Sequence, residues 1–413
     1  MKYRILVALA SLVLAALILL LLPLDAPIMQ QPSTTIPAQS STPSSTTTVP
    51  PTLPPKDPGV VRLYSCDDRF LSAFSQFAAE YTALTGVEVV VLRPDADGCQ
   101  ATLQRYMESE DPPTMLCIHN QRQLLIWQDT LLDLEDTPLA STLCNDGLGM
   151  RLDGKLLGVP AEVAGYGLLV NAELLAHKAA LTRDGDFGSF SALTTAVQIL
   201  KNNSVKAFPS PTLTLRDAWH LLLADDQQNV RAFLDLAAAN CNKSGDPMTL
   251  FLNGKSAFYL GGSWEYDTLA AFTDSTLDVM HLDILPNYAA GAMQYICNTI
   301  WCLNASARQV DIDATMDFMV WMVTARENSP APVDRLEVLS PFADAAWYGN
   351  RLENKLRTYM RTETAVLQFD GGEMGAEPLL TALSAYIAQR NNETWQQLCQ
   401  TVETIKASYG YHS

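Results

Sequence analysis

Apolar and polar positions in residues 60–118 follow two alternating patterns. Three short apolar runs read as strands, at 60–64, 87–92 and 114–118. Aromatic side chains recur at helical spacing over 70–81, and a helix-like stretch covers 101–107. This order predicts parallel strands joined by right-handed crossovers, with their carboxyl ends at one sheet edge, where α/β proteins bind ligands.

The rest of the chain continues this pattern. Further apolar runs predict strands at 156–160, 165–170, 251–262, 278–285 and 295–303. Apolar residues at helical spacing predict helices at 190–200, 219–224, 314–324 and 379–388. The predicted fold class is therefore α/β.

The N-terminal 27 residues read as an export signal. After Lys2 and Arg4, residues 5–22 are apolar apart from Ser11, and as a helix they would span about 27 Å of a bilayer core of about 30 Å. The basic flank predicts export of everything that follows. Both a cleaved signal peptide and an uncleaved signal anchor fit, so the protein is either anchored at the extracellular face of the cytoplasmic membrane or secreted.

Residues 28–59 read as a linker. From 32 to 55, nineteen of twenty-four residues are Pro, Ser or Thr, and such a segment cannot bury enough surface to fold. Composition alone does not separate a functional spacer from a disordered remnant.

Net charge and cysteine content limit the partners and cofactors that we expect for this protein. The 413 residues include 27 Lys plus Arg and 45 Asp plus Glu, giving a net charge of −18, which disfavours nucleic acid as a partner. The cysteines form no CxxC pair and the histidines are scattered, so we expect no metal site and no cofactor. Export permits disulfides, and Cys66 and Cys99 each follow a strand-like run, which suggests one bridge between them.

Four segments, in order along the chain, share features of one family. They are residues 77–89 (FAAEYTALTGVEV), 154–160 with 165–171 (GKLLGVP and GYGLLVN), 253–264 (NGKSAFYLGGSW) and 311–323 (DIDATMDFMVWMV). In that order they resemble the first helix and second strand, the segment crossing between lobes, the glycine-turn signature and the helix ending the first lobe of the family 1 extracellular solute-binding proteins. These are the carbohydrate receptors of ABC importers.

The resemblance implies a two-lobed periplasmic-binding-protein-like fold of type II, with hinge strands and a central cleft. The first lobe would cover 60–165 plus 286–325 and the second 166–285 plus 326–413, with 278–285 as a returning hinge strand. It implies a monomer that captures a sugar or oligosaccharide by lobe closure and delivers it to ABC permease subunits. A membrane-tethered solute sensor uncoupled from transport is the alternative.

Trp264 and Tyr266 are the candidates for stacking on a sugar. A sugar presents hydroxyls and an apolar ring face, so its site needs carboxylates or amides together with flat aromatic rings. The two residues alternate along a predicted extended stretch, so their rings should point to one side. The resemblance implies aromatic ligand contacts just after the glycine turn, and packing in the core is the alternative for either ring.

Polar candidates lie at the predicted strand ends. Asp67 and Asp68 follow the first strand, and Asn120 and Arg122 follow the third, where the resemblance implies polar ligand contacts. Helix capping is the alternative for the aspartates, and surface solvation for the other two. The crossing segment adds two side chains that can face the cleft, Glu162 and Tyr166.

Catalytic patterns are missing from the sequence. The glycine turn before Trp264 is not a GxSxG elbow, and no HExxH helix occurs. An exported glycoside hydrolase needs two carboxylates from separate elements that straddle a bond, whereas Asp67 and Asp68 are adjacent. We therefore expect a binding protein and not an enzyme.

Overall fold

A computed structural model describes most of the chain beyond the N-terminal region. The described residues are 57–181, 189–210, 213–222, 227–273, 282–285, 292–327, 329–346, 349–362, 364–371 and 376–409. The expected export signal at 1–27 and nearly all of the expected linker lie outside them. Among the helices in these ranges, none combines the length and the apolar character needed to cross a bilayer.

The first sheet confirms the strands predicted for residues 60–118. Its order is β2-β1-β3-β10-β5-β4, and β1 pairs in parallel with both β2 and β3. The carboxyl ends of these three strands therefore meet at one edge, as expected. The strands are β1 Val60–Tyr64, β2 Glu88–Leu92, β3 Met115–Ile118, β4 Met150–Leu152, β5 Lys155–Pro160 and β10 Ile300–Leu303.

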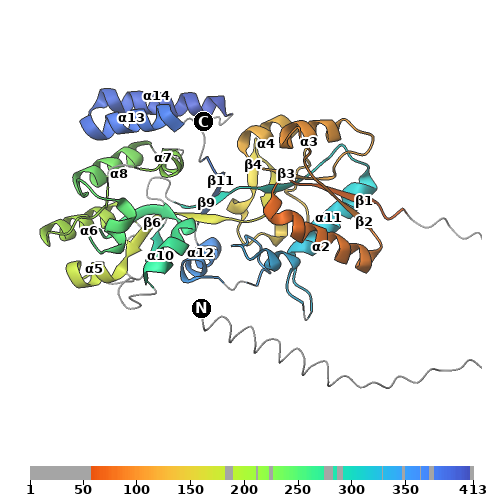
Figure 1. Cartoon of the computed structure of the whole chain (residues 1–413), viewed down its shortest axis with the longest axis horizontal. Helices are drawn as coiled ribbons and strands as arrows, with labels where there is room; N and C mark the ends of the chain where they lie inside the picture. The colour runs from red at the N-terminus through yellow and green to blue at the C-terminus, as the bar shows by residue number, and fades with distance from the viewer. Residues whose placement is uncertain are drawn as a thin grey trace, which may run out of the picture. The chain divides into compact units, whose positions relative to one another are not determined.

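Two helical layers cover this sheet (Figure 1). Helix α2 (Asp68–Thr85) is capped by Asp67, buries Phe70, Phe74 and Phe77, and ends at Gly86, whose positive φ of 78° suits a residue without Cβ. Helices α2 and α11 share one hydrophobic cluster with the sheet, and α3 and α4 pack on the other face. The remaining bounds are α3 Cys99–Met107, α4 Gln121–Trp127 and α11 Gln309–Val323.

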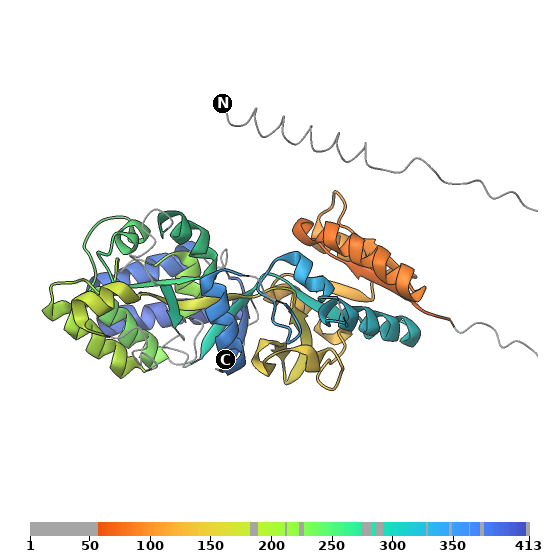
Figure 2. The ribbon, with the colours of Figure 1, turned by 90° about the horizontal axis from the view of Figure 1, so that it is seen from below.

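The second sheet runs β11-β9-β6-β7, with β8 paired to β6. Successive side chains of β6 point to opposite faces, so Leu168 packs with α7, α8, α13 and α14, whereas Leu169 packs with α9 and α12. Figures 1 and 2 show these two helical layers. The strands are β6 Ala164–Asn171, β7 Phe258–Gly262, β8 Leu282–Leu285, β9 Met293–Cys297 and β11 Ala365–Phe369.

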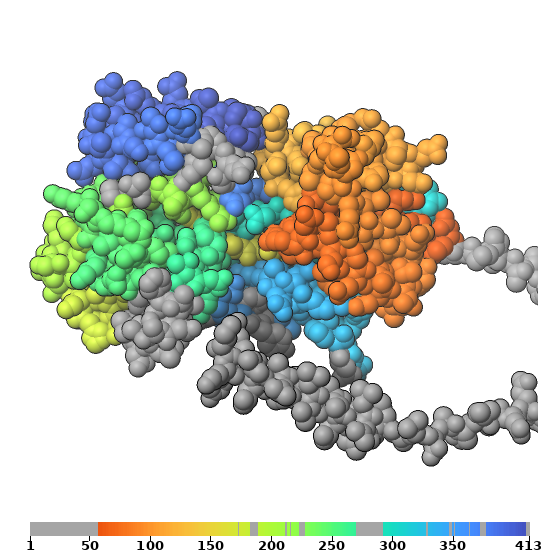
Figure 3. Space-filling view, in the orientation of Figure 1, coloured from red at the N-terminus to blue at the C-terminus, as the bar shows by residue number. Residues whose placement is uncertain are grey.

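The helices of this second lobe all follow residue 171 in the sequence. They are α5 Ala172–Ala179, α6 Phe190–Asn202, α7 Leu215–Leu222, α8 Gln227–Ala239, α9 Pro247–Leu252, α10 Tyr266–Thr273, α12 Arg351–Thr362, α13 Ala376–Gln389 and α14 Asn392–Ser408. In the space-filling view, α13 and α14 (blue) cover the upper side of this lobe (Figure 3). Short 3-10 turns include η3 Asp146–Leu148, η4 Ser263–Glu265 and η5 Pro332–Leu336.

Two short segments connect the sheets, and we refer to them together as the hinge. Residues 161–163 join β5 to β6, and residues 298–299 join β9 to β10. The backbone N–H of Val163 donates to the carbonyl of Leu339 at 2.9 Å, so a third segment runs alongside. The chain thus has the two-lobed α/β fold, and its lobes are joined by short crossing segments.

Several predicted boundaries differ from the structure. The apolar run 295–303 forms two strands, because Asn298 and Thr299 break it at the hinge, so the return to the first lobe falls there and not at 286. Strand β8 lies in the second sheet beside β6, so residues 282–285 are not a hinge strand, and the rest of that prediction, 278–281, lies outside the described residues. Phe342 and Ala345 pack in the first-lobe core, although residues after 325 were expected in the second lobe. The strand expected at 251–262 begins only at Phe258, because Phe251 belongs to α9.

A disulfide ties β1 to α3. It joins Cys66 and Cys99, the pair suggested by the sequence, with Cα atoms 5.9 Å apart. Cys66 follows β1 and Cys99 begins α3, so the bond fixes the carboxyl end of β1 directly before Asp67.

Candidate functional site

Arg69 joins the first lobe to the hinge. Its Nη2 lies 2.6 Å from Oδ2 of Asp67 and 2.6 Å from Oε1 of Glu162. Burial alone would raise the pKa of Asp67, but the hydrogen bonds from Arg69 outweigh it and lower that pKa. Asn298 Nδ2 donates to Glu162 at 3.5 Å, so both crossing segments contribute to this group.

His119 lies beside this group at the end of β3. Its Nδ1 is 2.9 Å from Oγ1 of Thr299, the second residue of the hinge segment. Burial lowers the pKa of His119, against the opposing effect of Asp67, and its Nε2 is buried without a hydrogen-bond partner among the described residues.

In the second lobe, the candidate site is built around the indole ring of Trp264. Its ring rests on Gly262, where an added Cβ would clash with it. Tyr166, paired with Gly262 across β6 and β7, lies parallel to the indole with ring centroids 6.0 Å apart. The guanidinium carbon of Arg216 lies 3.6 Å from the indole centroid, which is cation–π geometry.

Asp370 connects this aromatic group to the hinge. It follows β11, and its backbone N–H donates to the carbonyl of Cys297 at 2.9 Å, one residue before Asn298. Its carboxylate lies 2.7 Å from Nη2 of Arg216 and 3.5 Å from Nε2 of His220. The Arg69 group and the Arg216 group are therefore linked through the backbone of Cys297 and Asn298 at the hinge.

A layer of buried polar side chains lies beneath Trp264. His220 and Gln294 are almost fully buried, and Tyr166 lies between them, 5.3 Å from the His220 ring and opposite Gln294 in the strand register. The side-chain amide of Gln294 has no hydrogen-bond partner within the described residues. Burial lowers the pKa of His220, against the effect of Asp370, so this layer is polar but uncharged.

Asp217, in the same helix as Arg216, should make the free energy of unfolding depend on pH. Burial raises its pKa to about 6 despite a 2.5 Å hydrogen bond from Thr214. Because the folded state binds the proton of Asp217 more tightly than the unfolded chain does, protonation stabilises the folded state. This stabilisation is fully present below pH 4 and is lost as pH rises through 6. We expect Asp217→Asn to raise the free energy of unfolding by about 2 kcal/mol at pH 8 and by little at pH 4, measured by urea denaturation. Equal destabilisation at both pH values would contradict this, and exposed Asp68→Asn is the control.

The structure brings four of the predicted site residues into this region. Asp67 and Glu162 share Arg69, and Trp264 lies on Tyr166. Tyr166 is fully buried and donates its hydroxyl to the carbonyl of Asp217 at 2.9 Å, so it supports Trp264 and does not itself face solvent.

The other predicted residues lie elsewhere or serve the backbone. Trp264 and Tyr266 are not on an extended stretch, because η4 and α10 begin there, and Tyr266 packs against the cluster on the opposite face of the sheet. Asn120 caps α4 by accepting from Gln123 N–H at 2.9 Å. Asp68 and Arg122 are exposed on the first turns of α2 and α4.

Sequence reasoning missed Arg69, Arg216, His220 and Asp370. One signal was available for Asp370, because the strand-like sequence AVLQF at 365–369 followed by Asp-Gly-Gly is typical of a strand end. Arg216 has no such signal, since its role depends on the packing of α7 beside β11. Trp347 and Tyr348, which could supply further aromatic contacts, lie outside the described residues.

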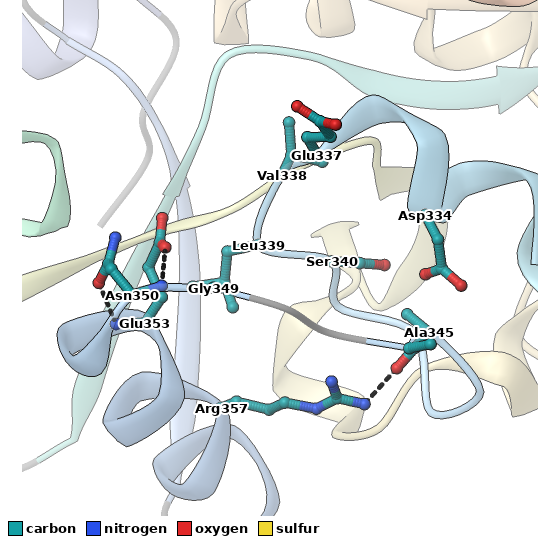
Figure 4. A pocket seen from close by; sticks show the side chains of 11 residues that line it. Asp334, Glu337, Val338, Leu339, Ser340, Ala345, Gly349, Asn350, Glu353 and Arg357 are labelled. Carbon is teal, nitrogen blue, oxygen red and sulfur yellow. Dashed lines mark hydrogen bonds between the residues drawn. The ribbon is translucent and has the colours of Figure 1, made fainter. Parts of the chain in front are cut away.

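A cavity of about 480 Å³ lies between the segment 334–346, of which Ala345 packs in the first-lobe core, and the start of α12 in the second lobe (Figure 4). Three of its polar side chains already bond to the backbone. Asn350 and Glu353 exchange hydrogen bonds in a capping box at the start of α12, and Arg357 donates to the carbonyl of Ala345. We therefore place the candidate site at the Arg69–Trp264 region and not in this cavity.

The donor set of the site suits a polar organic solute. Within the described ranges, no three His, Cys, Asp or Glu side chains are grouped so as to hold a metal ion. Carboxylates, guanidinium groups and an indole ring instead offer hydrogen bonds and stacking.

Solved structures of other solute-binding proteins have a similar fold. The fold matches the bacterial solute receptor AcbH, described with a preference for β-D-galactopyranose, at TM-score 0.63 and 15% identity over 86% of this chain and 98% of that one. It also matches a family 1 extracellular solute-binding protein from Bifidobacterium longum subsp. infantis (TM-score 0.60, 13% identity, 84% and 99% covered) and the sugar-binding protein MalE from Xanthomonas citri (0.59, 14%, 85% and 98%).

Sequence comparison identifies the family directly. A search of curated proteins gave no match. The family model described as bacterial extracellular solute-binding protein matches residues 76–331, more than half of the chain. The chain therefore belongs to the bacterial extracellular solute-binding proteins.

Proposed function

We propose that this protein captures a sugar or oligosaccharide between its two lobes and delivers it to an ABC importer. The observation that carries the proposal is that the Arg69–Glu162 group and the Arg216–Trp264 group are both anchored to adjacent hinge residues, Asn298 and Cys297. A solute contacting both ends would stabilise the closed form, because only that form brings both sets of contacts to it.

The chemistry of the site favours a neutral solute. Carboxylates outnumber the guanidinium groups, and each guanidinium is already paired, so an anion would meet net repulsion. The site carboxylates are Asp67, Glu162 and Asp370. The similar fold of AcbH, a receptor with a preference for the neutral sugar β-D-galactopyranose, supports the same class.

Export supports the same proposal. The family is extracellular, and a disulfide between Cys66 and Cys99 suits an oxidising compartment. The apolar segment at residues 5–22 would supply the signal or the anchor, which leaves the binding lobes outside the membrane.

A thermal-shift panel tests the solute class. We expect D-galactose, maltose or raffinose, at 100 times its Kd, to raise the melting temperature by about 5 °C, because a ligand of the folded state stabilises it by about 2.7 kcal/mol. Glucuronate is the anionic control and should give no shift. No shift with any sugar, from a protein shown to be folded by circular dichroism, would contradict sugar capture.

Delivery to an importer needs a separate measurement. We expect the sugar-loaded protein to stimulate the ATPase of its permease complex in proteoliposomes. Sugar binding without any stimulation would favour the alternative, a tethered solute sensor.

A further inference from the structure

The indole of Trp264 is covered in the structure. The guanidinium of Arg216 lies 3.6 Å from the ring centroid, Tyr166 lies parallel to the ring, and Gly262 supports it. A sugar ring stacks on an aromatic face at van der Waals distance, close to where the guanidinium already lies. Sugar and guanidinium therefore compete for the same place.

Among the described residues, one ion pair holds Arg216 in this place. Its Nη2 lies 2.7 Å from Oδ2 of Asp370, and both side chains keep about a quarter of their surface exposed, at 28% and 22%. Its Nε is buried without a hydrogen-bond partner among the described residues. An arginine with an unsatisfied buried N–H, held at one end by a partly exposed carboxylate, can leave at modest cost.

We propose that Arg216 is a displaceable cover of Trp264, and that the solute must replace its guanidinium on the indole. The proposal rests on the proposed function and adds the residue that sets its specificity. A neutral ring with an apolar face can take the guanidinium's place, whereas a solute without such a face cannot repay the loss of the cation–π contact. Arg216 thereby favours pyranose-like rings over open-chain polyols.

Acrylamide quenching tests the cover without any solute. The chain has seven tryptophans, so the signal of Trp264 is the difference between a protein and its Trp264→Phe variant. We expect Arg216→Ala to raise the quenching constant of Trp264 at least twofold. The matched control is Arg231→Ala, which removes a guanidinium from over Trp395 and should leave Trp264 unchanged. An unchanged quenching constant in Arg216→Ala would overturn the proposal.

Calorimetry with galactose, maltose, raffinose and sorbitol tests the role in specificity. We expect Arg216→Ala to bind its sugar about tenfold more tightly than the wild type, a gain of about 1.4 kcal/mol, and to lose discrimination against sorbitol. Weaker binding would instead make Arg216 a direct solute contact and overturn the proposal. If no sugar binds either protein, the proposed function fails, while the quenching result still decides whether Arg216 covers Trp264.

Discussion

Reducing the disulfide between Cys66 and Cys99 should lower the free energy of unfolding by about 3 kcal/mol. The bond closes a loop with a sequence separation of 33 residues, and constraining a loop of this size in the unfolded chain is worth about that amount. The measurement is the urea midpoint with and without dithiothreitol. The loss should appear equally in the Cys66→Ser, Cys99→Ser double variant.

Two control variants distinguish the effect of reducing this disulfide from any effect of dithiothreitol on the other cysteines. The double variant should no longer respond to dithiothreitol, and Cys241→Ser, which removes a cysteine outside any disulfide, should keep the full response. A response that persists in the double variant would contradict the assignment. Because Asp67 directly follows Cys66, we also expect the reduced protein to bind its sugar more weakly.

Sequence patterns predicted the strands and helices of residues 60–118 well because these elements are local. Strand β1 occupies the predicted residues, and α2 ends at Gly86, where the positive φ needs a residue without Cβ. Each of these features depends on a few neighbouring residues. The hinge was harder to locate, because Asn298 and Thr299 interrupt an apolar run without any Gly or Pro to mark the break.

The site was predicted only where it coincides with a strand end or a motif. Asp67 and Glu162 flank predicted strands, and Trp264 follows a glycine turn. Arg216 and Asp370 are separated by more than 150 residues and meet only because α7 packs beside the end of β11. Tyr266 was assigned to the wrong face because a helix begins at that residue, so the two-residue alternation of a strand no longer applies.

Substituting Gly262 by Ala should abolish sugar binding while the protein stays folded. A Cβ at this position would overlap the six-membered ring of Trp264 and force the indole off Tyr166. The backbone at Gly262 is extended, with φ of −129°, so alanine itself causes no backbone strain. The displaced ring, and not the strand, should therefore account for the loss.

The adjacent glycine supplies the control. Gly261 is on the same strand but faces the other side of the sheet, where an added Cβ would lie 2.8 Å from the ring of Tyr259 and 3.6 Å from Glu265. Gly261→Ala should lower stability slightly and keep sugar binding within about threefold, less than 1 kcal/mol. Calorimetry on both variants measures the difference, which we expect to exceed tenfold. Equal binding by the two variants would mean that the solute does not use Trp264, because only Gly262→Ala moves that ring.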